Sequence, residues 1–182
     1  MNNKIYKIDT QLDNYYTGIE ENESLLLEDL MIEAMLGNNI EANKIIQQNS
    51  EILKFINKNG FGVIHIIAWL RNYDFVDIFK RHGGDVNMLD DTGFTALHYS
   101  IMSNNIAMTL RLLRNGANPN MCDHNGNTCL HVAVVNNSTN VIELLLAYNA
   151  DPFIKNSNDH TPYDYSCINT TLKNIIDKFL TD

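Results

Sequence analysis

The sequence predicts an all-α solenoid, in which helix-turn-helix units stack along one axis and carry short β-turn or hairpin tips. The main observation is an internal repeat: Gly60–His65, Gly93–His98 and Gly126–His131 follow one another at equal intervals, and 159–164 is a degraded further copy at the same interval. A fixed period of about 20–50 residues is typical of repeat proteins. The chain has 182 residues and is 45% hydrophobic, which is enough to form a core.

Each unit is predicted to begin with a turn and a short apolar helix. Asp90–Gly93 and Asp123–Gly126 are clusters of turn-forming residues, and their glycines can adopt a positive φ. First helices are predicted to follow over 96–103 and 129–136. Thr95 stands directly before the first of these, where a hydroxyl can accept a hydrogen bond from a free helix amide.

A second helix is predicted to complete each unit, over 106–114 and 139–148. Gly116 and Asn149 follow these segments, and both residue types favour the left-handed conformation that ends a helix. Helices of this length are unstable alone. We therefore expect the units to stabilise one another by stacking.

The repeated segment resembles the ankyrin repeat family, whose unit is written D-x-x-G-x-T-P-L-H-x-A. The match is best over Asp123–Ala133 and next best over Asp90–Ser100, and the resemblance extends over about residues 25–180. It implies that the repeated histidines hydrogen-bond the helix start and the adjoining turn. It assigns structural roles to Gly60, His65, Gly93, Thr95, Leu97, His98, Gly126, Thr128, Leu130 and His131.

The chain divides into an acidic N-terminal segment and an ankyrin repeat domain. The segment, 1–24, has no periodicity and is either a disordered tail, or an ordered extension of the first unit or a regulatory segment. The first unit is atypical, with helices expected at about 29–34 and 40–48, because a terminal unit must present a polar face to water. The domain, 25–182, is predicted to contain units at 25–56, 57–89, 90–122, 123–155 and 156–182.

Two units depart from the motif. Gly62 and Val63 replace Thr-Pro in the unit 57–89, which predicts a weaker N-cap there. Asp164 replaces the motif histidine in the unit 156–182.

The charge balance argues against nucleic acid or an anionic membrane as the partner. The chain has 22 acidic and 13 basic residues, and its net charge is −9. It contains no run of 18 apolar residues, and residues 1–16 lack the apolar core of a signal peptide. Three cysteines are too few for a disulfide framework. We therefore expect an intracellular, cytoplasmic protein, acting in its own cell or in a host cell.

The histidines and cysteines do not predict a metal or catalytic site. His65, His98 and His131 belong to different stacked units, whose helices lie about 8–10 Å apart, whereas zinc requires nitrogens at about 2 Å. Cys167 and His160 lie near each other in sequence, but no oxyanion site or pocket is predicted beside them. We predict no enzyme, no cofactor and no metal, and keep a small Cys/His-dependent enzyme or metal protein as the alternative of another class.

The remaining candidate site is a concave face formed by the turn tips and the first helices. The resemblance implies that variable residues beside each turn glycine and near the end of each first helix contact a partner protein. Aromatic residues are among those that dominate such interfaces. The predicted rim is acidic, formed by Asp90, Asp91 and Asp123. The predicted partner-binding residues are Phe61, Trp69, Leu70, Asp91, Phe94, Met102, His124, Asn125 and Val135.

Two versions of a protein-binding function remain open. One is a generic intracellular scaffold or subunit. The other is a host-directed viral or bacterial protein similar to ankyrin-type inhibitors of NF-κB, with a Rel/NF-κB-type factor as its partner. Cellular inhibitors of that kind carry a D-S-G-x-x-S degradation signal, and residues 1–24 contain none. We expect a monomer in either version.

Overall fold

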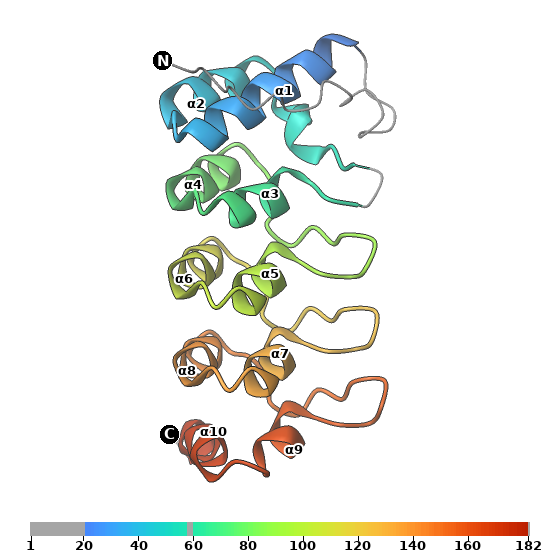
Figure 1. Ribbon diagram of the computed structural model, residues 1–182, viewed down its shortest axis with the longest axis vertical. Helices are drawn as coiled ribbons and strands as arrows, with labels where there is room; N and C mark the ends of the chain where they lie inside the picture. Colours follow the sequence, from blue (N-terminus) through green and yellow to red (C-terminus); the bar gives the residue numbers. More distant parts are fainter. Residues whose placement is uncertain (1–20, 58–59, 182) are drawn as a thin grey trace, which may run out of the picture.

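The structure, a computed structural model, describes residues 21–57 and 60–181. Its helices pair and stack in one direction to form an elongated array (Figure 1), and the described residues contain no β-strand. The elements are α1 (Glu21–Leu36), α2 (Asn39–Gln48), the 3-10 helix η2 (Ser50–Lys54), α3 (Val63–Leu70), α4 (Tyr73–Arg81), α5 (Ala96–Met102), α6 (Ile106–Arg114), α7 (Cys129–Val135), α8 (Thr139–Ala147), α9 (Pro162–Ser166) and α10 (Thr170–Thr181).

The helices form two columns, and a row of loops projects to one side (Figure 1). The first helices α3, α5, α7 and α9 lie above one another, and the second helices α4, α6, α8 and α10 form the other column. The loop before each first helix extends away from the helices. We call these loops the fingers; they are 88–95, 121–128, 154–161 and the described part of 55–62.

The predicted helices are confirmed to within one residue in the two central units. α6 occupies the predicted range, while α5, α7 and α8 each end one residue earlier than expected. The chain turns early after α5 and α7 because Asn104 and Asn137 adopt positive φ values of 50° and 54°. Gly116 and Asn149 also have positive φ values, 87° and 63°, as the sequence predicts for the ends of the second helices.

The first unit departs from expectation at its start. α1 begins at Glu21, so residues 21–24 are helical, although the sequence places them in the acidic segment. Acidic residues near a helix N-terminus stabilise the helix, a contribution that a search for repeats does not consider. The rest of the predicted acidic segment, 1–20, lies outside the described residues.

A capping box starts the first helices. In α5, the Thr95 hydroxyl accepts from the His98 amide at 3.4 Å, and Nδ1 of His98 accepts from the Thr95 amide at 3.1 Å. In α7, Nδ1 of His131 accepts from the Thr128 amide at 3.0 Å and lies 3.0 Å from the Thr128 hydroxyl. In α3 only the histidine half remains: Nδ1 of His65 accepts from the Gly62 amide at 3.0 Å, and glycine has no side chain to return the bond. The expected weakness of that N-cap is thus confined to one of its two hydrogen bonds.

The core is continuous along the array. It runs as one cluster from Leu27 in α1 to Ile176 in α10. The motif residues Leu97 and Leu130 are 1% and 0% exposed. Because each unit buries its apolar side chains against its neighbours, the stability of one unit depends on the next.

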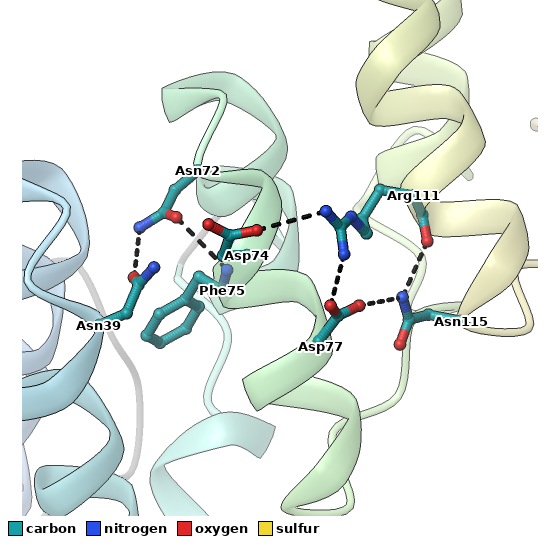
Figure 2. A network of polar contacts seen from close by, with 7 residues as sticks. All are labelled: Asn39, Asn72, Asp74, Phe75, Asp77, Arg111 and Asn115. Atoms are coloured by element: carbon teal, nitrogen blue, oxygen red, sulfur yellow. Dashed lines mark hydrogen bonds and ion pairs between the residues drawn. The ribbon is translucent and has the colours of Figure 1, made fainter.

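Polar contacts join the second helices on the other side of the array (Figure 2). Arg111 of α6 reaches Asp77 of α4 at 2.5 Å, and the side-chain amide of Asn115 donates to the same carboxylate at 2.7 Å. Asn72 precedes α4 and donates to Asn39 of α2 at 2.9 Å. Partly exposed ion pairs contribute only about 0–1 kcal/mol each. These contacts therefore fix the alignment of the second helices more than they add stability.

Candidate protein-binding face

Each unit exposes a large apolar side chain at the same repeat position near the end of its first helix, and we call this set the apolar column; α1 also exposes Leu25, Ile32 and Met35. Each member stands at or within two residues of the end of a first helix. The members are separated by one repeat length each: Leu36, Trp69, Met102, Val135 and Ile168. In that order, their side chains are 74%, 79%, 50%, 69% and 91% exposed.

The apolar column results from helical periodicity. In the four units after the first, the residues three positions earlier are Ile66, Tyr99, Val132 and Tyr165, which lie on the same helix face and are half-buried. The corresponding residue before Leu36 is Glu33. Column residues lie where the helix ends, so no further turn covers them. Exposed apolar residues in a contiguous patch mark interaction sites, whereas single ones carry no such meaning.

The nine predicted partner-binding residues fall into three settings. Trp69, Met102 and Val135 belong to the apolar column. Asp91, His124 and Asn125 are exposed in the fingers. The other three are half-buried: Phe61 and Phe94 in the fingers, and Leu70 at the end of α3.

Phe61 and Phe94 do not continue the apolar column but pack around Tyr99. Their ring centroids lie 5.3 Å and 5.7 Å from that of Tyr99, and Phe94 also stacks on the His98 ring at 5.4 Å. The strip expected from Phe61, Phe94, Trp69 and Met102 is therefore divided. Its phenylalanines belong to a half-buried aromatic cluster, and the other two side chains stand exposed.

The prediction of an acidic rim is wrong at two of its three positions. Asp90 and Asp123 are only 5% and 8% exposed. Asp90 organises its own finger, because its carboxylate accepts from the amides of Thr92 at 2.8 Å and Phe94 at 2.9 Å and from the Tyr99 hydroxyl. Burial works to raise the pKa of Asp90, but hydrogen bonds from Thr92 and Tyr99 outweigh it and hold that pKa below its ordinary value.

The motif histidines connect neighbouring fingers. Nε2 of His65 and of His131 lies 3.2 Å and 3.0 Å from a carbonyl oxygen of the next finger, whereas the buried Nε2 of His98 makes no hydrogen bond within the described residues. Burial lowers the pKa of all three imidazoles. The described residues include no group of three or more His, Cys, Asp or Glu side chains that could hold a metal ion.

The residues considered for a Cys/His site have other surroundings. Asp164 caps α9: its carboxylate accepts from the Thr161 amide at 2.9 Å and hydroxyl at 2.8 Å, and these hydrogen bonds lower its pKa. Cys167 is exposed and, within the described residues, makes no hydrogen bond to a histidine. Cys129 is buried at the start of α7, and burial raises the pKa of its thiol.

An open cleft of about 470 Å³ lies between the last two fingers and the helices α7 and α9. Val132, Val135 and the Tyr165 ring form its apolar part. Asparagine side chains, among them Asn125 and Asn136, form much of the remainder. No Asp, Glu, Lys or Arg side chain is among the described residues that line it.

Sequence reasoning missed both ends of the apolar column and one wall of the cleft. The repeat contained the signal for the two ends of the column: Leu36 lies one repeat length before Trp69, and Ile168 lies one repeat length after Val135. No sequence signal marked Asn156 and the rest of the last finger, where the motif is degraded.

The fold and this face define a class, the repeat arrays that present a preformed surface along a row of first helices. A family model of ankyrin repeats, in three copies, matches residues 30–121 and 107–181. The chain belongs to the ankyrin repeat family. Ankyrin repeats are generally protein–protein interaction modules and are typically non-catalytic.

Two further searches found nothing. None of the curated proteins matches the chain significantly. No helix among the described residues has the length and apolar character needed to cross a membrane.

Proposed function

We propose that this chain is a non-catalytic protein-binding module that docks a partner protein on its concave face, with the apolar column at the centre of the contact. The observation that carries the proposal is the column itself, whose five side chains are 50–91% exposed. Burying apolar surface stabilises a complex by about 25 cal/mol per Å². Large side chains exposed in every unit contribute little to folding, so a partner that covers them is their most direct explanation.

The array is also suited to binding by its rigidity. Hydrogen bonds at the N-caps join each finger to its own helix. Other hydrogen bonds join one finger to the next, such as the one that the His124 amide donates to the Thr92 carbonyl at 3.1 Å. A preformed surface loses little conformational freedom on association, which favours affinity. The exposed Asp91 and the net charge of −9 favour a partner surface that carries Lys or Arg around an apolar centre.

Within this function, we propose a Rel/NF-κB-type factor as the specific partner, bound by a host-directed protein. The proposal is supported by the family, whose repeats generally bind other proteins. If it holds, residues 1–24 do not provide the release signal of cellular inhibitors, because they contain no D-S-G-x-x-S motif. A generic scaffold is the alternative. Titration of a purified Rel-type dimer with the full chain separates them: saturable binding that is lost in Trp69→Ala supports the specific partner, and no binding leaves the scaffold.

The general proposal is tested with Trp69→Ala and a matched control, Ile40→Ala. Trp69 in α3 is 79% exposed and belongs to the apolar column, and Ile40 in α2 is 75% exposed in the other column of helices. Partners are captured from lysates of candidate host cells on the full chain, and their affinities for each variant are measured. We expect Trp69→Ala to weaken binding by about 2 kcal/mol or more, and Ile40→Ala to leave it unchanged. Equal affinities for both variants, with unchanged stability, would refute the docking face.

A further inference from the structure

We propose that the concave face recognises a segment of its partner in an extended, polyproline-II-like conformation, with an apolar residue at every third position and uncharged residues between them. The inference rests on the proposed function, because it specifies the kind of partner segment that the same face accepts.

The first argument is the spacing of the apolar column. The helices that carry Trp69, Met102 and Val135 pack directly on one another, and packed helices lie about 8–10 Å apart. A polyproline-II chain rises about 3.1 Å per residue with three residues per turn, so every third side chain returns to one face after about 9 Å. A β-strand returns to one face after about 6.6 Å and does not match this interval. Residues i, i+3 and i+6 of such a segment therefore lie opposite successive members of the apolar column.

Spacing alone also admits an α-helix, because seven helical residues rise about 10.5 Å. The polar groups beside the column distinguish the two. Within the described residues, the side-chain amides of Asn125, Asn136 and Asn158 in the cleft make no hydrogen bond. An α-helix bonds its main-chain groups internally, whereas a polyproline-II chain bonds none of its own and requires partners once water is displaced. Each asparagine amide offers two donors and an acceptor, which matches alternating peptide N–H and C=O groups.

The charge and ring content of the face agree with this occupant. The described lining residues of the cleft include no ionised side chain at neutral pH, because burial lowers the pKa of His131 below its ordinary value of 6.5. A charged residue buried there would lack a partner, so the segment in the cleft is uncharged. Trp69 and Tyr165 provide rings along the face, and grooves lined by aromatic rings are common docking sites for polyproline-II segments.

The test is selection of random 15-residue displayed peptides on the full chain, with Trp69→Ala as the counter-selection. We expect enriched peptides with apolar residues at every third position and few charges between them. Trp69 is the single tryptophan of the chain and is 79% exposed, so binding should shift its emission to shorter wavelength. Apolar residues at the i, i+3, i+4 and i+7 positions of a helix, or no enrichment that depends on Trp69, would overturn the inference.

Variants of the cleft add a second measurement. Asn125→Ala and Asn136→Ala should each weaken binding of a selected peptide by about 2- to 10-fold, the effect of one lost hydrogen bond. Asn140→Ala, at an exposed asparagine of α8, is the matched control and should have no effect. Equal affinities for all three variants would show that the amides do not hold the segment.

Failure of this inference can be told apart from failure of the proposed function. Helical peptides whose binding is lost in Trp69→Ala would leave the docking face in place and refute only the extended segment. If neither selected peptides nor captured proteins depend on Trp69, both are refuted.

Discussion

Gly93→Ala tests how closely successive fingers are packed, and Gly116→Ala is its matched control. Both glycines have positive φ values, 80° and 87°. A Cβ at position 116 would meet no atom within 4 Å, whereas a Cβ at position 93 would lie 2.8 Å from the backbone nitrogen of His124 and 3.0 Å from the carbonyl carbon of Asp123. The two substitutions share the backbone strain, and only Gly93→Ala forces the next finger to move.

The expected magnitudes follow from these contacts. A left-handed alanine costs about 1–2 kcal/mol, and the reduced freedom of the unfolded chain offsets about 0.4–1 kcal/mol of this. Gly116→Ala should therefore destabilise the protein by about 1 kcal/mol. Gly93→Ala adds an overpacked contact with backbone atoms, and contacts of that kind cost about 1–3 kcal/mol. Its total should be about 2–4 kcal/mol.

Urea unfolding followed by far-ultraviolet circular dichroism measures both variants against the parent chain. We expect the midpoint of Gly93→Ala to fall well below that of Gly116→Ala, with similar slopes. If the two free energies of unfolding agree within about 0.5 kcal/mol, Gly93 is not in close contact with the backbone of the next finger.

Two further predictions concern the core and the histidines. Leu97→Ala and Leu130→Ala should each lower the free energy of unfolding by about 2–5 kcal/mol, because both side chains are fully buried, and a loss below about 0.5 kcal/mol at both sites would contradict the repeat register. Burial lowers the pKa of His65, His98 and His131 from 6.5, so below about pH 6.5 the unfolded chain binds protons that the folded chain excludes. The free energy of unfolding, measured by urea titration, should therefore be highest above that pH. It should fall as the pH decreases, by at most about 1.4 kcal/mol per pH unit for each histidine, and a free energy that stays constant between pH 7.5 and 5.5 would refute this.

The helices could be predicted from the sequence because the repeat fixes several constraints at once. Thr95 and Gly116 mark the limits of one unit, and Thr128 and Asn149 mark the same limits in the next. α1 could not be placed in this way, because no copy of the turn motif precedes it in the sequence and no copy of its N-terminal half occurs elsewhere in the chain.

The candidate site was less predictable because register does not determine burial. Phe94 and Met102 both occupy variable positions of one unit, yet Phe94 is covered by Tyr99 and His98 while Met102 is half exposed. Asp90 looked like a surface charge in the sequence. Its burial depends on hydrogen bonds that only the folded finger brings together, including the one from Tyr99 nine residues later.

The last unit separates residues that serve stacking from residues of the apolar column. Asp159 replaces the turn glycine and adopts a positive φ of 62°, and within the described chain no following finger packs against it. Asp164 replaces the histidine and keeps the capping hydrogen bonds, but it has no second ring nitrogen to reach another finger.

Groups that contact a following unit are thus lost from the last unit, while the column position keeps an apolar residue, Ile168, that is 91% exposed. A side chain so exposed contributes almost nothing to the core, so stacking does not explain its presence. The apolar column and the stacking motif are therefore under different physical demands, as expected if a partner protein covers the column in the way proposed above.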